Sequence, residues 1–95
     1  MKAAALDFAG VEEVETWGRP TFRVGKELFA AMHGELLILR SRPDDQEQRL
    51  ADPRFQVAPY WGHNGWVAID ISKVRSDSEL TDLLNAAWQL VGAKS

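Results

Sequence analysis

The feature that most constrains this chain is a single apolar stripe in its C-terminal part. Apolar residues recur there at the three- and four-residue spacing of an α-helix, at Leu80, Leu83, Leu84, Ala87, Trp88 and Val91. Ser76 and Glu79 fit the S-x-x-E capping box that begins a helix, and Gly92 is a residue type that ends one. A helix with one apolar face must bury it against another layer, which the rest of the chain has to supply.

Segments with strand patterning supply that layer. Alternation and short apolar runs predict strands at 21–24, 27–33, 36–40, 55–60 and 66–71. Gly25-Lys26 predicts a hairpin turn between the first two, and Asn64-Gly65 predicts a type I′ turn between the last two, with positive φ at Gly65. A short helix is expected from Lys2 to about Ala9, and another from Pro43 to near Asp52. Residues 11–20 are expected to be irregular.

These elements predict an α+β fold, a two-layer α/β sandwich in the order α-β-β-β-α-β-β-α. The sheet is expected to be antiparallel, with the helices mainly on one face. The 95 residues fit one domain, residues 1–95. The chain has no cysteine, which excludes a disulfide scaffold, thiolate metal sites and a cysteine nucleophile.

Side chains alternate across a strand, so residue parity assigns the two faces of the sheet. One set is expected under the final helix: Phe22, Val24, Phe55, Val57, Val67, Ile69 and Ile71. The opposite set is Arg23, Gln56, Trp66 and Asp70, joined by Leu36 and Ile38 if Arg40 points the same way. That second face suits a dimer or partner surface or a ligand face. Alternatively, the second helix or a loop covers it.

Charge is distributed unevenly along the chain. The net charge is −3, yet residues 1–43 are neutral and residues 44–95 carry the whole imbalance. Any anion site is therefore expected on the first half or in a local patch. No run approaches the roughly 18–20 apolar residues that a membrane span needs, and Asp7 interrupts the apolar start of the chain. The expectation is a cytoplasmic protein without membrane contact.

Catalytic chemistry has little support in this sequence. The two histidines, His33 and His63, lie far apart and neither has a metal-ligand spacing with an acidic residue. Nucleophile-elbow, P-loop and dinucleotide-binding motifs are all absent. The expectation is a non-enzymatic domain with no catalytic residue, no metal and no cofactor.

Two long motifs and the final helix together carry a family resemblance. The first runs from Gly10-Val11-Glu12-Glu13 into T-W-G-R-P-T-F-R-V-G-K-E-L-F-A at 16–30, and the second is P-Y-W-G-H-N-G-W-V at 59–67. With D-L-L and A-W-Q-L-V in the final helix, the chain resembles the MmcQ/YjbR family of small bacterial proteins. The resemblance implies an α-β3-α-β2-α fold, which has been compared with frataxin-like and secretion-chaperone-like folds. Family members often begin with a longer first helix.

The resemblance also implies a function. The family commonly carries a DNA-binding label, in which two hairpins act as wings; here these are 21–33 and 55–71. The expected nucleic-acid-binding residues are Arg19, Arg23, Lys26, Arg40, Trp61, His63, Asn64 and Trp66. Cationic side chains take phosphates and aromatic rings stack on bases, although the negative net charge predicts weak DNA binding. The alternatives are a protein-interaction or chaperone-like module, including a homodimer, and a small-ligand cleft near the two Trp-Gly motifs.

Overall fold

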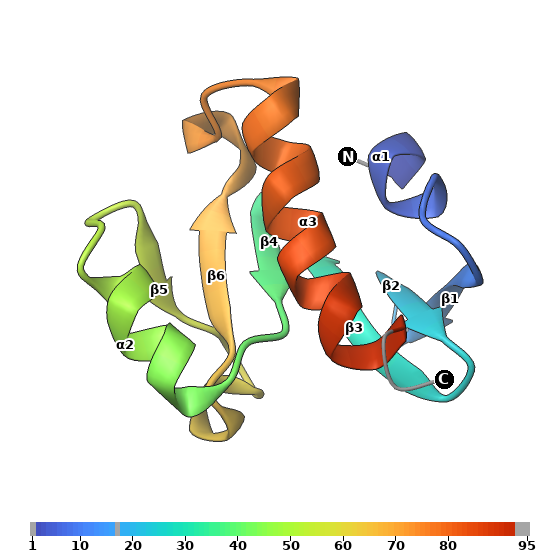
Figure 1. Ribbon diagram of the computed structural model, residues 1–95, viewed down its shortest axis with the longest axis horizontal. Coiled ribbons are helices and arrows are strands. Elements are labelled where there is room, and N and C mark those ends of the chain that lie inside the picture. The colour runs from blue at the N-terminus through green and yellow to red at the C-terminus, as the bar shows by residue number, and fades with distance from the viewer. Residues whose placement is uncertain (1, 17, 93–95) are drawn as a thin grey trace.

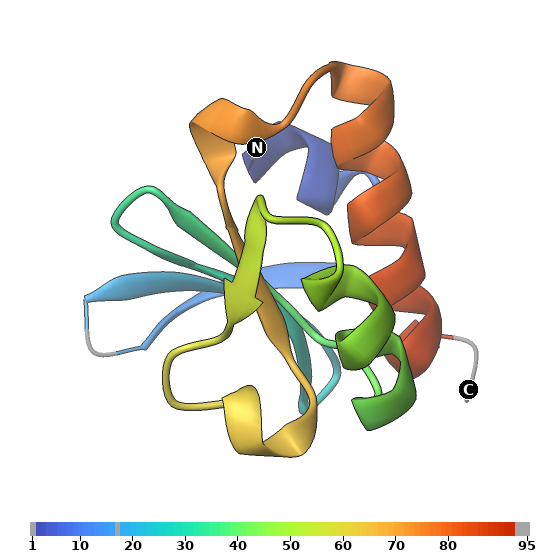
Figure 2. The same ribbon diagram turned by 90° about the vertical axis from the view of Figure 1, so that its left-hand side faces the viewer.

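One antiparallel sheet of six strands organises the computed structural model, which describes residues 2–16 and 18–92 (Figure 1). The strand order across the sheet is β1-β2-β3-β4-β6-β5. The elements are α1 (Lys2–Leu6), β1 (Val11–Thr16), β2 (Arg19–Val24), β3 (Glu27–His33), β4 (Leu36–Leu39), α2 (Pro43–Leu50), β5 (Phe55–Val57), β6 (Val67–Asp70) and α3 (Asp77–Gly92). Two 3-10 turns, η1 (Gly62–Asn64) and η2 (Ile71–Lys73), flank β6. The predicted α+β class and the helices on one side of the sheet are confirmed (Figure 2).

The strand β1 is absent from the sequence prediction, which treated residues 11–20 as irregular. The prediction was wrong because β1 lies at the sheet edge and four of its six residues are exposed, including three glutamates. The strand β1 is held in place by backbone hydrogen bonding along the whole of β2, from Val11 opposite Val24 to Thr16 opposite Arg19. Such pairing leaves no apolar alternation for a pattern to detect. The first helix is also shorter than predicted and ends at Leu6.

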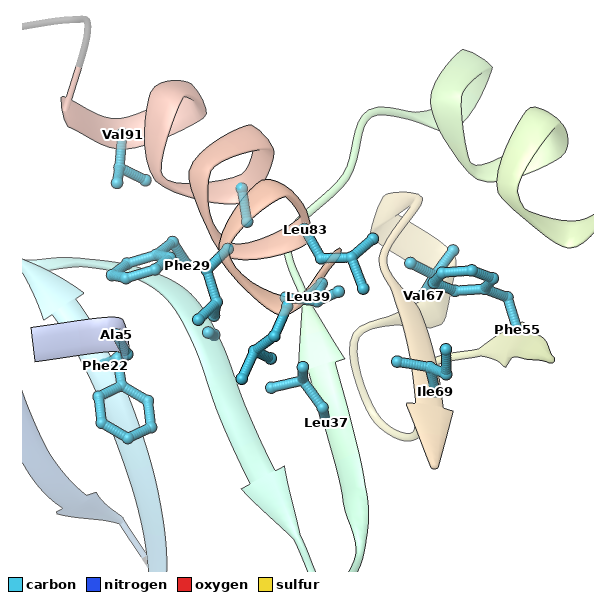
Figure 3. Packing of buried hydrophobic residues seen from close by; sticks show 14 residues of the cluster. Ala5, Phe22, Phe29, Leu37, Leu39, Phe55, Val67, Ile69, Leu83 and Val91 are labelled. Atoms are coloured by element: carbon cyan, nitrogen blue, oxygen red, sulfur yellow. The ribbon is translucent and has the colours of Figure 1, made fainter. Parts of the chain in front are cut away.

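The main core lies between α3 and the sheet (Figure 3). Leu80, Leu83, Leu84, Ala87 and Val91 of α3 are all buried there, as the helical stripe predicts. The sheet contributes Phe22, Phe29, Ala30, Leu37, Leu39, Phe55, Val67 and Ile69. The parity assignment is therefore confirmed at its centre, whereas Val57, at the outer edge, is 52% exposed.

Trp88 is only half-buried; it packs against the main core and also contacts the N-terminal segment. Its indole N–H donates a hydrogen bond to the carbonyl of Ala9, and its ring lies 5.5 Å from that of Phe8. Trp88 thus attaches α1 to α3.

An arginine-centred network fixes the start of α3. Arg54 donates hydrogen bonds to both carboxylate oxygens of Glu79, at 2.8 and 3.0 Å, and also pairs with Asp52 at 2.9 Å. Ser76 caps the helix by accepting the N–H of Glu79, which confirms the Ser76 half of the predicted capping box, whereas the Glu79 carboxylate accepts the N–H of Arg75 in place of that of Ser76. The Arg54 guanidinium is the main reason that the pKa of Glu79 falls to about 2.

The connection between β5 and β6, residues 58–66, is not the predicted two-residue type I′ turn. It contains η1, and Gly65 follows it at φ +95°, where its N–H donates to the carbonyl of Gly62. The positive φ of Gly65 is confirmed, but Asn64 does not share it, and type I′ requires both. A Cβ on Gly65 would lie 2.6 Å from the backbone nitrogen of Pro43. The close approach to the start of α2 is why glycine is needed here.

Replacing Glu79 by Gln tests the arginine network. Because the pKa of Glu79 is lowered from 4.5 to about 2 on folding, its carboxylate stabilises the fold above pH 4.5, and this contribution is lost as the pH falls toward 2. We expect Glu79→Gln to have a lower thermal midpoint than wild type at pH 7. The difference between the two midpoints should shrink as the pH falls. Thermal melts between pH 2 and 7 measure this. A gap that is constant with pH would contradict it.

Replacing Gly65 by Ala tests the approach of residues 58–66 to α2. We expect a loss of about 2–5 kcal/mol, from the left-handed backbone together with the collision against Pro43. Gly34→Ala is the matched control, since Gly34 has φ +61° but a Cβ there would meet no atom within 4 Å. It should cost only about 1–2 kcal/mol. Urea melts of wild type and both variants give the loss of unfolding free energy in each. Equal losses in Gly65→Ala and Gly34→Ala would contradict the close approach of Gly65 to Pro43.

Candidate nucleic-acid interface

The second face of the sheet, opposite α3, is closed at its centre by residues 58–66, here called the covering segment. Figure 2 shows the described helices on the other side. A second buried cluster lies on this face and consists of Ala31, Ile38, Ala58, Trp66 and Ala68, with Leu28, Leu36 and Trp61 packed against it. Of the alternatives that the sequence leaves open, the loop is thus the one that covers this face.

The predicted apolar surface at Leu36 and Ile38 needs correction. The register confirms that both face away from α3, since Ile38 pairs with Ala31 and Ala68 in the second cluster. However, Ile38 is 0% exposed because the covering segment lies over it. It is therefore a core residue of this face and offers no surface to a partner.

A row of three aromatic side chains with an arginine at each end crosses this face; we call it the aromatic ladder. The Arg19 guanidinium lies over the Tyr60 ring at 5.0 Å, and Tyr60 meets Trp61 edge-on at 6.1 Å. Trp61 stacks on Trp66 at 5.5 Å, with 20° between the rings. Arg40 closes the row over the Trp66 ring at 5.7 Å. Arginine over an aromatic face is favourable because the ring carries negative charge density there.

Tyr60 is the most exposed aromatic side chain of this ladder. It is 63% exposed, whereas Trp66 is 7% exposed. Its φ is +66°, the one positive φ at a non-glycine residue in the described part of the chain. A bulky residue in this region costs about 1–3 kcal/mol and persists only where its surroundings hold it. Arg19 and the ring of His33, at 6.2 Å, flank it.

The covering segment is fixed by α2. The side-chain amide of Gln46 donates hydrogen bonds to the carbonyls of Gly62, at 2.9 Å, and Trp66, at 3.0 Å. The N–H of Ala58 donates to the same Trp66 carbonyl at 3.2 Å. One glutamine thus ties both the start of η1, at Gly62, and the end of the covering segment, at Trp66, to the helix that follows β4.

A groove of about 730 Å³ opens between the first hairpin, β2–β3, and the covering segment. Its charged and polar lining residues are Lys26, Glu27, Arg40, Ser41, Arg42, Asn64 and Gln89, and its apolar ones are Leu28, Pro43, Trp61, Trp66 and Leu90. Arg40 is held in place by a hydrogen bond from its guanidinium to the carbonyl of Leu28 at 3.2 Å. Arg42 pairs with Asp45 at 3.0 Å but keeps 70% of its side chain exposed. Three cations thus face one carboxylate, Glu27.

The structure brings together five of the eight predicted site residues in this groove: Lys26, Arg40, Trp61, Asn64 and Trp66. Arg19 lies at the other end of the ladder. Arg23 is on the same face but donates hydrogen bonds to Thr16 and Thr21, so it links β2 to β1. The side chain of His63 lies outside the described residues.

Two residues of this surface are absent from the predicted set, Tyr60 and Arg42. Arg42 stands two positions after Arg40 and directly before α2, so its place in the groove depends on how the chain turns there. Tyr60 follows Pro59 in the second motif, but its left-handed backbone has no sequence signal. Trp66 also needs correction: it is too buried to stack on a ligand, and it supports Trp61 instead.

A second groove, of about 710 Å³, lies between α2 and α3. It shares Arg40, Arg42 and Gln89, among others, with the first groove and adds Gln48, Arg49 and Asn85. We call it the interhelical groove. No aromatic residue lines it.

The described residues contain no group of three His, Cys, Asp or Glu side chains that could hold a metal ion. Among the helices that are described, none is long and apolar enough to cross a membrane.

Comparison with solved structures gives one clear likeness. The crystal structure of Deinococcus radiodurans protein DR2400, described as a DUF419 domain, superposes with a TM-score of 0.80 and 19% identity. The match covers 98% of this chain and 76% of that chain. At this identity the likeness concerns the fold alone. No curated protein matches the chain.

The family assignment rests on the sequence as well as on the fold. The model of the family described as YjbR matches residues 6–90, which contain the groove, the covering segment and the aromatic ladder. The chain therefore belongs to the YjbR family.

Proposed function

We propose that this domain binds nucleic acid, without catalysing a reaction, in the groove between its first hairpin and the covering segment. The observation that carries the proposal is the convergence of Lys26, Arg40 and Arg42 with Trp61 and Asn64, which come from three separate segments of the chain. Lysine and arginine contact phosphate oxygens, and amide and aromatic side chains contact sugars and bases. The two walls of the groove correspond to the two wings that the family resemblance implies.

The local charge supports this proposal in spite of the net charge of −3. Three cations and one carboxylate line the groove, so its own balance is positive. A small positive footprint on an acidic domain gives weak binding, on the order of 10⁻⁴ to 10⁻⁵ M near physiological salt.

The alternative, a protein-interaction or homodimer surface at Leu36 and Ile38, has lost its main support. Ile38 is fully buried, and Leu36 is partly buried. Such an interface usually presents a contiguous apolar patch of a few hundred Å², and Ile38 does not contribute to one.

Charge reversal at Lys26 tests the proposal. About three phosphate contacts predict a slope of log K against log salt of roughly −2 to −3 for wild type. We expect Lys26→Glu to weaken binding for all sequences and to reduce the slope by about one. Lys26 is exposed at a turn, so the thermal midpoint should hardly change. Fluorescence anisotropy with a labelled DNA oligonucleotide, titrated at several salt concentrations, measures both.

Lys73→Glu is the matched control, because Lys73 lies in η2, beyond the end of β6 that is remote from Trp66. It makes the same change in net charge and should leave the slope unaltered. An equal loss of DNA affinity in Lys26→Glu and Lys73→Glu would show that the overall charge, and not the groove, causes the effect. No binding by wild type at low salt would overturn the proposal.

A further inference from the structure

We infer that the preferred ligand is a single strand of nucleic acid, whose bases stack on the exposed ring of Tyr60 while its phosphates lie along the groove. This inference rests on the proposed function and adds the form of the ligand. The observation that carries it is the aromatic ladder, which continues beyond the groove to Arg19.

Tyr60 and Trp61 have different roles in the ladder. Trp61 lies partly buried against the second cluster and stacks on the buried ring of Trp66, which is a structural contact. Tyr60 has no comparable burial, at 63% exposed, yet its backbone is held at φ +66°. An exposed ring on a backbone held in a sparsely populated conformation is a combination that clusters at functional sites.

The cations flank the rings on both sides. Arg19 lies at one end of the ladder, and Lys26, Arg40 and Arg42 line the groove at the other. The ladder follows the β2–β3 hairpin from His33, beside Tyr60, to Leu28, beside Arg40. The five steps from Leu28 to His33 rise about 17 Å at roughly 3.3 Å each. That is the length of about five stacked bases at 3.4 Å per nucleotide.

A single strand uses this surface better than a duplex does. In a duplex the base faces are stacked internally, and only base edges are accessible in the grooves. An exposed aromatic ring therefore adds little binding energy with a duplex. With a single strand it can stack on an unpaired base, whichever base that is. The described helices lie on the other side of the sheet and reach the groove only at Pro43, Gln89 and Leu90, so none lies across this face to enter a major groove.

The test compares one labelled DNA strand of mixed sequence with its duplex, in the same low-salt buffer, by fluorescence anisotropy. We expect wild type to bind the single strand about fivefold to a hundredfold more tightly than the duplex. The same sequence made as RNA is a further arm, and tighter binding of either strand than of the duplex supports the inference.

Variants at Tyr60 separate the ring from its hydroxyl and its backbone. Tyr60→Phe keeps the ring and should keep the preference for the single strand. Tyr60→Gly removes the ring and suits the positive φ, so it should fold, lose about tenfold in affinity for the single strand, and bind the duplex as wild type does. Circular dichroism melts of both variants confirm folding.

The outcomes distinguish this inference from the proposed function. Equal affinity of wild type for strand and duplex, or equal loss on both in Tyr60→Gly, overturns the inference, while binding sensitive to Lys26→Glu leaves the proposed function standing. If Tyr60→Gly does not fold, the inference is decided by the affinities of wild type and Tyr60→Phe for the single strand relative to the duplex. Absence of binding to strand and duplex alike overturns both proposals.

Discussion

The stack of Trp61 on Trp66 is the contact on which the second face of this domain depends. The two indoles lie 5.5 Å apart and nearly parallel, over a floor that includes Ala31, Ile38 and Ala68. The alanines leave the space that the rings fill, since a larger side chain at either position would displace them. Because Trp61 lies before η1 and Trp66 lies directly before β6, the stack joins two parts of the covering segment across the turn between them.

The first hairpin, the covering segment and the start of α2 form the groove together. Gln46 holds the carbonyls of Gly62 and Trp66, and Gly65 lets the segment approach the backbone of Arg42 and Pro43. Arg40 lies over the opposite side of the stack, against Trp66, and reaches the carbonyl of Leu28. The cations of the groove are therefore positioned by the same packing that closes the sheet, and a loosened stack would disperse them.

Most of the fold follows from patterns that the sequence displays. The stripe of α3, its capping box and the parity of Phe22, Val67 and Ile69 are direct consequences of burial on one side of a sheet. The strand β1 could not be predicted in this way, because its exposed glutamates carry no alternation and its order comes from pairing with β2. The type I′ turn predicted at Asn64-Gly65 does not form. Gly65 instead follows η1 and lies close to the backbone of Pro43, a contact between distant segments that a local turn pattern does not show.

The candidate site was predictable in its residue types but not in its arrangement. Lysine, arginine and tryptophan in the two motifs indicate the groove residues Lys26, Arg40 and Trp61. Whether an aromatic residue is exposed or supporting depends on the path of the covering segment, so the sequence predicts Trp66 as a contact residue although it is 7% exposed, and it gives no role to Tyr60, which is 63% exposed. The left-handed backbone of Tyr60 is a property of the folded chain and has no local signal.

The central claim is that the second face, with its covering segment, is the binding surface of this domain. Amide chemical-shift mapping by NMR, during titration of labelled protein with a short single-stranded oligonucleotide, tests it most directly. The account predicts salt-sensitive shifts at residues 26–28, 40–42 and 58–66, with the exposed residues among 77–82 of α3 and those of η2 unchanged. Shifts confined to the part of the interhelical groove that the first groove does not share, at Gln48, Arg49 and Asn85, or an unchanged spectrum at high oligonucleotide concentration, would contradict it.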